Sequence, residues 1–309
     1  MKSRLMQAAQ PLLERFRQQT PLRAGSLLVT LFGDSILPRG GQIALGSLIR
    51  LASLFGLNER LVRTAAARLV HEGWLETRRM GKLSEYHLSD DGRERFMEAT
   101  GRIYAAPDAP WPGGWTLVVL PALPAALRKR LRQELIWLGF GEFAPGVFAH
   151  PELTAATLKQ LRGTPHGAKL FVFDASLKTD DAPARLAMLG WDLSELDDRY
   201  RRFVQRFLPV QRALASDERA DCEAAFVIRT LLIHEYRKLH LRDPLLPSRL
   251  LPDNWAGRAA ADQCRAIYAG LFEQSESYLT DTAMTLDGGV PAPSAEVYAR
   301  FGGLGLNGT

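Results

Sequence analysis

Residues 58–88, NERLVRTAAARLVHEGWLETRRMGKLSEYHL, decide how the first third of this chain folds. Asn58 is a favourable N-cap, and no glycine or proline follows it until Gly73, so the first half predicts a helix that ends before that glycine. The second half holds two runs typical of strands, 74–79 and 83–88. Because the residues between these runs include a glycine, they predict a tight β-hairpin.

The predicted helix has an apolar face and a basic face. Successive helical residues turn by about 100°, which places Val62, Ala65, Ala66 and Leu69 on one side and Arg60, Arg63, Thr64, Ala67 and Arg68 on the other. Arg78, Arg79 and Lys82 gather at the tip of the hairpin. A basic helix face is most often simply solvated, and DNA binding is the alternative.

The segment before this helix favours DNA binding. Residues 46–55 predict a short amphipathic helix, and 56–58 form a turn of the length that a helix-turn-helix uses. With the hairpin added, the order of parts is that of a winged helix-turn-helix, whose second helix enters a major groove. A first helix over 22–36 and a short strand over 42–45 that pairs with the hairpin complete this prediction. The candidate DNA-binding residues are Asn58, Arg60, Arg63, Thr64, Arg68, Arg78, Arg79 and Lys82.

The composition is that of an ordinary globular protein with a small excess of positive charge. The 309 residues include 39 Lys and Arg against 34 Asp and Glu, a net charge of +5, which permits a polyanionic partner without requiring one. Two cysteines, Cys222 and Cys264, lie far apart and suggest a reducing compartment. No run approaches the roughly 18 apolar residues of a membrane-spanning helix. Residues 1–23 resemble a loose basic arm, so we expect a cytoplasmic protein without a membrane partner.

A second domain is expected over 114–175, after a linker rich in proline and alanine. Its predicted elements are, in order, a strand (115–120), a helix ending before Gly139, a hairpin (140–149), a helix (151–162) and a strand (169–174). The order β, α, β, β, α, β is the ferredoxin-like plan. An open edge or face of such a sheet often serves for dimer contacts, so this domain is the predicted site of dimerisation.

The rest of the chain is predicted to be mostly helical and to form a third domain over 180–300. Helices are expected over 194–208, where Pro209 would end the helix, and over 222–241, which is apolar nearly all round and therefore buried. Glu235 falls on an apolar side of the second helix, where a buried acid needs a cationic partner. The predicted fold class is thus α+β, with a winged helix-turn-helix domain (22–103), a central ferredoxin-like domain and an α-helical C-terminal domain.

The sequence contains no recognisable catalytic motif. A zinc-protease motif would need a second histidine four residues after His234, where Lys238 stands. The glycines form no usual phosphate-binding loop, no serine stands in a Gly-x-Ser-x-Gly elbow, and neither cysteine has an evident histidine partner. We therefore predict no catalytic residue, no metal site and no cofactor.

The order of parts and four motifs resemble the PaaX family, bacterial repressors of phenylacetate catabolism. The motifs are GLNERLVRTA (56–65) and RLVHEGWL (68–75) in the winged domain, and HEYR (234–237) and RDPLLP (242–247) in the last domain. The last two are the more specific, because winged helices are common. The middle domain is similar to the Cas2 fold, but its first strand ends at Pro121, where a Cas2 nuclease keeps a metal-binding aspartate. This departure argues against nuclease activity.

The resemblance implies a homodimer that binds a partly palindromic, double-stranded operator. It also implies release from that operator by an aryl-acetyl-CoA thioester, phenylacetyl-CoA in the best-known members. Because CoA carries several phosphate charges, basic residues near the two C-terminal motifs are candidate contacts. The candidate ligand-binding residues are His234, Arg237, Arg242 and Arg249, with Lys238 beside them. The alternative for each of them is that it braces the α-helical domain.

Two other classes of function stay open on the sequence. One is an enzyme that acts on nucleic acid through the middle domain, which cleavage on addition of magnesium would reveal. The other is a CoA-thioester-handling enzyme with an appended DNA-binding module, which the release of free thiol from acyl-CoA would reveal.

Overall fold

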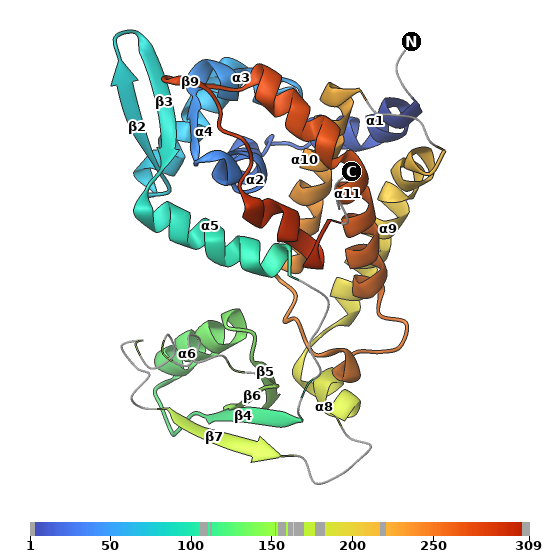
Figure 1. Ribbon diagram of the computed structural model, residues 1–309. Helices are drawn as coiled ribbons and strands as arrows, with labels where there is room; N and C mark the ends of the chain where they lie inside the picture. Colours follow the sequence, from blue (N-terminus) through green and yellow to red (C-terminus); the bar gives the residue numbers. More distant parts are fainter. Residues whose placement is uncertain are drawn as a thin grey trace. The chain divides into compact units, whose positions relative to one another are not determined.

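A computed structural model describes residues 4–105, 111, 113–151, 153, 159, 163, 170–176, 183–216 and 221–304 of the chain (Figure 1). Contacts between residues group the chain into two compact units, each built from separate stretches of sequence. Unit 1 comprises 1–107, 201–241 and 258–309, and unit 2 comprises 108–200 and 242–257. This grouping concerns packing alone, so the three domain ranges expected from the sequence stay a prediction.

The secondary structure expected between residues 22 and 103 is present in unit 1. In order, the elements are α2 (Ala24–Leu31), the π-helical turn η1 (Phe32–Ile36), the 3-10 turn η2 (Leu37–Arg39), β1 (Gln42–Ala44), α3 (Leu45–Ser53), α4 (Glu59–His71), β2 (Leu75–Met80), β3 (Leu83–Leu88) and α5 (Asp90–Ile103). The strands form an antiparallel sheet in the order β1-β3-β2, with Gln42 opposite His87. The short strand therefore pairs with the hairpin, as predicted.

Local sequence explains where α4 begins and which face it buries. The Oδ1 atom of Asn58 accepts a hydrogen bond from the backbone N–H of Leu61 (2.9 Å), which caps the first turn. Just before it, Gly56 takes a φ of +85°, which glycine adopts readily and which lets the chain turn between α3 and α4. The predicted apolar face of α4 is buried and the predicted basic face is exposed.

The N-terminal arm is a helix, contrary to the loose arm expected from the sequence. α1 (Arg4–Arg17) lies against α10 (Cys222–His240). It buries Leu5, Ala9, Leu12, Leu13 and Phe16. These residues recur at helical spacing, and their burial outweighs the charged residues between them that suggested a solvated arm.

The long helices of the C-terminal third agree with the sequence in part. α10 is buried along most of its length, as predicted. α9 (Ser194–Leu214) does not end before Pro209 but continues through it. A proline removes one backbone donor from a helix, and the burial of Phe207 and Val210 on either side of Pro209 compensates for that loss.

Glu235 is not the buried acid that the sequence predicted. About a quarter of its side chain (27%) stays exposed, and its carboxylate contacts the Lys238 ammonium (2.9 Å) and the Arg206 guanidinium (3.6 Å). The expected cationic partners are therefore present without the expected burial. Asp34, also in unit 1, is a deeply buried acid with cationic partners.

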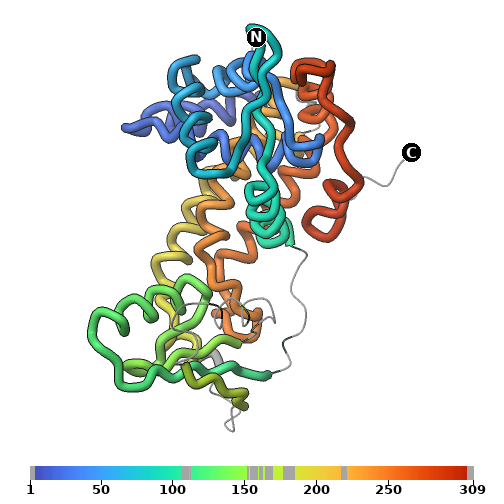
Figure 2. Tube along the Cα trace, turned by 90° about the vertical axis from the view of Figure 1, so that its left-hand side faces the viewer, coloured from blue at the N-terminus to red at the C-terminus, as the bar shows by residue number. Residues whose placement is uncertain are grey.

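After α11 (Ala256–Thr282) the chain runs back over the N-terminal elements (Figure 2). This segment holds a small hairpin, β8 (Met284–Thr285) and β9 (Gly288–Gly289), and the 3-10 turns of η5 (Ala295–Gly302). The backbone N–H of Ser294 donates to the carbonyl of Pro38 (2.8 Å), and that of Phe301 donates to the carbonyl of Tyr104 (2.8 Å). The segment after α11 therefore helps to hold the backbone at Pro38 and Tyr104 in place.

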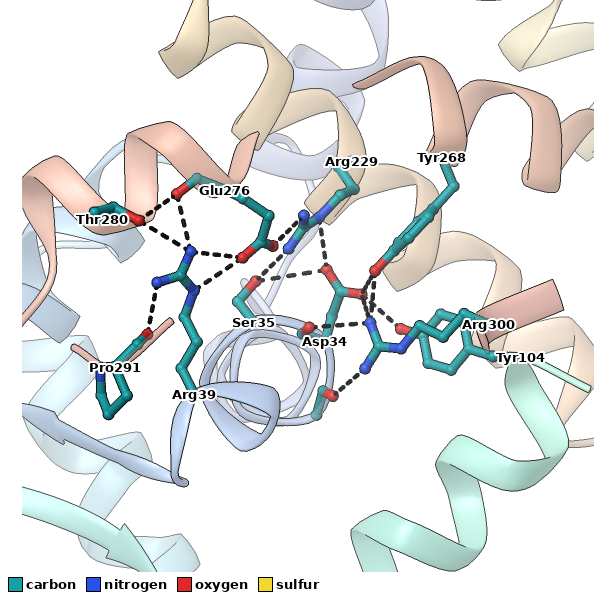
Figure 3. A network of polar contacts seen from close by, with 11 residues as sticks. Asp34, Ser35, Arg39, Tyr104, Arg229, Tyr268, Glu276, Thr280, Pro291 and Arg300 are labelled. Carbon is teal, nitrogen blue, oxygen red and sulfur yellow. Dashed lines mark hydrogen bonds and ion pairs between the residues drawn. The ribbon is translucent and has the colours of Figure 1, made fainter. Parts of the chain in front are cut away.

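A buried ionic network joins η1 to α10, α11 and η5 (Figure 3). The carboxylate of Asp34 accepts hydrogen bonds from Arg229 Nε (3.1 Å), Arg300 Nη1 (2.9 Å) and the hydroxyls of Tyr104 (2.7 Å) and Tyr268 (2.9 Å). Burial alone would raise the pKa of Asp34, but the two guanidinium charges and the two hydroxyl groups outweigh it and lower the pKa below its usual value. Asp34 is therefore ionised at neutral pH.

Glu276 of α11 extends this network to η2. Its carboxylate accepts from Arg229 Nη1 and contacts Arg39 Nη2 at 2.7 Å. Arg39 is almost fully buried, and its Nη1 donates to the carbonyl of Pro291 (2.8 Å). Because the buried charges are paired and hydrogen-bonded, the network fixes η1 and η2 against α10 and α11 of the same unit.

Unit 2 contains a four-stranded antiparallel sheet in the order β5-β6-β4-β7. Its elements are β4 (Gly114–Val119), α6 (Ala125–Trp137), β5 (Gly141–Ala144), β6 (Val147–His150), β7 (Phe171–Ser176) and α8 (Pro183–Gly190). Val118, Leu135, Phe140 and Phe148 form its core, so α6 covers one face of the sheet. The strands and the first helix are those predicted. The helix expected over 151–162 lies almost entirely outside the described residues, so the full ferredoxin-like order stays a prediction.

Candidate nucleic-acid interface

The exposed face of α4 carries half of the side chains predicted to bind DNA. Arg60, Arg63, Thr64 and Arg68 are all exposed. Arg63 and Arg68 each pair with a glutamate one helical turn away, at 2.7 Å in both cases. Exposed pairs of this kind contribute roughly 0.3 to 0.5 kcal/mol. Either arginine can therefore exchange its carboxylate for a phosphate or a base edge at small cost.

Three further cations are free to meet a polyanion. Arg60 on α4, Arg79 on β2 and Lys82 at the hairpin tip are exposed. None of them has an acidic partner within the part of the chain that the structure describes. Free cations of this kind neutralise phosphates and release counterions. The helix face and the hairpin tip therefore both offer positive charge to a nucleic acid.

Arg78 differs from the other candidates, because two acids already hold it. Its Nη2 lies 2.6 Å from Asp287 Oδ2, and its Nε lies 3.1 Å from Glu85 Oε2. Glu85 is buried in β3, and its other oxygen accepts from the backbone N–H of Leu286 (2.7 Å). The turn between β8 and β9 is thus fastened to the hairpin through Arg78 and Glu85. No residue near Arg78 in the sequence indicates this contact, since Asp287 lies 209 residues further along the chain.

Asn58 is a cap in this structure, and its contribution to stability can be separated from any contact with DNA. Asn58→Ala is expected to lower the free energy of unfolding by about 1 kcal/mol, because the N–H of Leu61 loses its acceptor. Asn58→Asp keeps the acceptor, so its free energy of unfolding is expected to lie within a few tenths of a kcal/mol of the wild-type value. Urea denaturation of both variants tests this. Equal losses in the two variants would contradict the capping role.

Two of the predicted ligand-binding residues of α10 hold α2 instead of facing open space. His234 is fully buried, with its Nδ1 2.9 Å from Thr30 Oγ1, and burial lowers its pKa well below the usual value. Arg237 donates from Nε to the same hydroxyl (2.8 Å) and from Nη2 to the carbonyl of Ser26 (2.7 Å). Burial also lowers the pKa of Arg237, to about 10. These contacts give both residues a bracing function between α10 and α2.

The other two predicted ligand-binding residues, Arg242 and Arg249, belong to unit 2 and are exposed. Arg249 lies in the 3-10 turn η4 (Ser248–Leu250), which lies against α8. Asp243, next to Arg242, is buried and accepts a hydrogen bond from the hydroxyl of Tyr200 (2.8 Å). The arginines of this loop are therefore available to a ligand of unit 2, whereas those of α10 are engaged in unit 1.

Other chemistry has little support in the described part of the chain. It holds no group of three or more His, Cys, Asp or Glu side chains placed to bind a metal ion. None of its helices is both long enough and apolar enough to cross a membrane. Cys264 is buried, and burial raises the pKa of its thiol well above the usual value, so this thiol is a weak nucleophile.

Comparison with known proteins gives matches along most of the chain. Three family models match it: PaaX-like protein (23–92), PaaX protein central Cas2-like domain (108–187) and PaaX-like protein C-terminal domain (191–281). The protein named Transcriptional repressor PaaX from Escherichia coli (strain K12) is 38% identical over 292 residues, which cover 93% of this chain and 92% of that protein. Among solved structures, the uncharacterized protein Rv0674 from Mycobacterium tuberculosis matches with a TM-score of 0.52 and 25% identity, over 75% of this chain and 89% of that one. The expected Cas2-like central domain is thereby confirmed, and the chain belongs to the PaaX family.

Proposed function

We propose that this chain is a cytoplasmic, DNA-binding transcriptional repressor of genes for phenylacetate catabolism, released from its operator by an aryl-acetyl-CoA such as phenylacetyl-CoA. The observation that carries the proposal is the identity of 38% to a transcriptional repressor along 93% of the chain. The exposed cationic face of α4 supports the DNA-binding part of it. The resemblance of the sequence to the family supplies the class of effector.

DNA binding uses a winged helix-turn-helix in this proposal. α3 and α4 are joined by a short turn, and the β2–β3 hairpin follows directly, as in proteins that place the second helix in a major groove and the wing on the backbone. Arg63, Thr64 and Arg68 are assigned to base edges. Arg60, Arg79 and Lys82 are assigned to phosphates, because they have no acidic partner among the described residues.

The proposed repressor is a homodimer that addresses two half-sites. Each chain has one α4, so a two-fold axis would place two such helices about one turn of DNA, roughly 34 to 36 Å, or a whole number of turns apart. The outer strand β7 of the sheet exposes Phe171 and Phe173, which suits a contact between two copies of unit 2. A footprint without any two-fold repeat would contradict the dimer.

The deciding experiment is DNA binding to the upstream region of the protein's own gene, at fixed salt, with and without phenylacetyl-CoA. The expected result is a specific complex that phenylacetyl-CoA dissolves and free phenylacetate does not. If the complex forms but phenylacetyl-CoA does not dissociate it, the proposed repressor function stands and the proposed effector is wrong. If the protein binds the upstream region of its own gene no more tightly than random DNA, the proposed repressor function is wrong.

Lys82→Ala tests the role of the hairpin tip. The variant is expected to bind matched and mismatched DNA more weakly by the same factor, and the slope of log K against log salt is expected to fall by about 1, because one phosphate contact is lost. Fluorescence anisotropy across a salt series measures both quantities. Lys129→Ala, which removes an exposed lysine of α6, serves as the control and is expected to leave the slope unchanged. A loss confined to the matched sequence would mean that Lys82 reads bases.

A further inference from the structure

The β8–β9 turn holds one cation of the β2–β3 hairpin and leaves the neighbouring cations alone. Arg78 of β2 lies opposite Glu85 of β3, and Asp287 approaches it from the turn, with 2.6 Å between Asp287 Oδ2 and Arg78 Nη2. Arg79 and Lys82 have no acidic partner in the part of the chain that the structure describes. We propose that Asp287 competes with DNA phosphate for Arg78 and thereby lowers the affinity of the protein for DNA. This inference rests on the proposed function and adds a residue that limits it.

Two backbone hydrogen bonds fix the β8–β9 turn without the Asp287 side chain. The N–H of Met284 donates to Ser47 Oγ of α3 (3.0 Å), and the N–H of Leu286 donates to Glu85 Oε1 (2.7 Å). β8 also packs against β1. Because these contacts do not involve the carboxylate of Asp287, that carboxylate is not needed to place the turn. A substitution of Asp287 therefore changes the charge beside the hairpin and leaves the turn in position.

The contact between Arg78 and Asp287 is open to a competing anion. The two side chains are 45% and 63% exposed, and exposed ion pairs of this kind are weak. Glu85, in contrast, is buried, and its Oε2 lies 3.1 Å from Arg78 Nε. Glu85 therefore holds the Nε side of the guanidinium on the sheet. The Nη2 side can donate either to Asp287 or to a phosphate oxygen, which is the anion that arginine binds best.

A bracing role and a competing role of Asp287 predict opposite changes in DNA affinity. If the pair with Arg78 braced the hairpin, loss of the Asp287 charge would loosen the hairpin and weaken DNA binding. If Asp287 competes with phosphate, the same loss frees Arg78 for one more phosphate contact and strengthens binding. Each such contact steepens the dependence of log K on log salt by about 0.9. The sign of the change therefore distinguishes the two roles.

Asp287→Asn in the full-length protein tests the proposal. Fluorescence anisotropy across a salt series measures binding to a random-sequence duplex and to the upstream region of the protein's own gene. We expect both affinities to rise by the same factor, roughly three- to tenfold at 0.1 M salt, and the salt slope to steepen by about 0.9. Asp281→Asn removes an exposed carboxylate of α11 and is the matched control, expected to bind within about twofold of the wild type. An unchanged or lower affinity of Asp287→Asn would overturn the proposal.

Arg78→Gln separates competition for Arg78 from general repulsion between Asp287 and DNA. Glutamine removes the positive charge and keeps a donor for Glu85, and circular dichroism checks that the variant is folded. Added to Arg78→Gln, Asp287→Asn is expected to leave the salt slope unchanged and to raise the affinity by less than about twofold. An equal gain with and without Arg78 would overturn the proposal, since Asp287 would then act by repulsion alone. If Arg78→Gln does not fold, the comparison of Asp287→Asn with Asp281→Asn still decides.

The random-sequence duplex separates this inference from the proposed function. If the wild type binds its upstream region no more tightly than random DNA, the repressor is contradicted, and the variants on random DNA still decide the role of Asp287. If the wild type binds its upstream region specifically and Asp287→Asn binds equally well, the competing role is wrong and the repressor stands. If the wild type binds neither duplex at low salt, both proposals are wrong.

Discussion

Asp34→Asn is expected to lower the free energy of unfolding of this protein by roughly 3 to 5 kcal/mol. The wild-type carboxylate is buried and contacts two buried guanidinium groups, those of Arg229 and Arg300. Asparagine keeps the approximate shape and removes the charge. Arg229 retains Glu276, but Arg300 has no second carboxylate within salt-bridge distance among the described residues. Urea denaturation followed by circular dichroism measures the difference.

The pH dependence of this difference has a definite sign. The folded-state pKa of Asp34 lies below its usual value, so the carboxylate stabilises the fold above the unfolded-state pKa, about 4, and stops doing so as the pH falls through the folded-state value. The difference in the free energy of unfolding between wild type and Asp34→Asn is therefore expected to be constant from about pH 5 to 7 and to decrease below about pH 4.

Asp262→Asn is the matched control for this substitution, since it makes the same change at an exposed position of α11. Its effect is expected to stay within about 0.5 kcal/mol at every pH. A small loss in Asp34→Asn, equal to that of the control, would show that the network contributes no net stability. Such a result would mean that apolar contacts alone stabilise unit 1.

Arg63→Ala is expected to weaken binding to the operator by about 1 to 3 kcal/mol, if the proposed DNA interface is right. The side chain is exposed on the outward face of α4, and its ion pair with Glu59 is of the weak, exposed kind. The loss should fall on one base position, because a bidentate contact discriminates that base from the others. Titration against DNA with each base at every position of one half-site measures both effects.

Arg265→Ala controls for the loss of an exposed arginine, since Arg265 lies on α11, outside α4 and the hairpin. Its operator affinity is expected to match the wild type. If Arg63→Ala instead weakens all sequences alike, Arg63 contacts a phosphate. If it has no effect on any sequence, the outward face of α4 does not read DNA, and the proposed assignment of bases to Arg63, Thr64 and Arg68 fails.

Local patterns predicted the elements that carry the proposed interface. A cap, a glycine and a helical period of apolar residues are signals within a few residues of one another, and α4 and its hairpin follow from them. The same period is present in α1, at Leu5, Ala9 and Leu12, although the charged residues between them are typical of a solvated arm. The helix end that Pro209 predicts does not occur, because the packing that keeps α9 intact comes from elsewhere in the fold.

Long-range pairs were out of reach of sequence reasoning. Asp34 lies among apolar residues at the end of a predicted helix, and nothing near it indicates Arg229 or Arg300. Arg78 has the same local sequence features as the other cations of the hairpin tip, and only the folded structure brings Asp287 beside it. Spacing along a sequence describes one element at a time, whereas these sites need the packing of several.

The network around Asp34 also bears on the synthesis of the protein. Its partners Arg229 and Arg300 lie 195 and 266 residues further along the chain. At about 5 to 20 residues per second, the ribosome needs roughly 13 to 53 s to pass from Asp34 to Arg300. α2, α3 and α4 are therefore made long before either arginine. In a chain that stops before Arg229 and Arg300, the Asp34 carboxylate therefore lacks both guanidinium partners, and the N-terminal helices lack the support of this network.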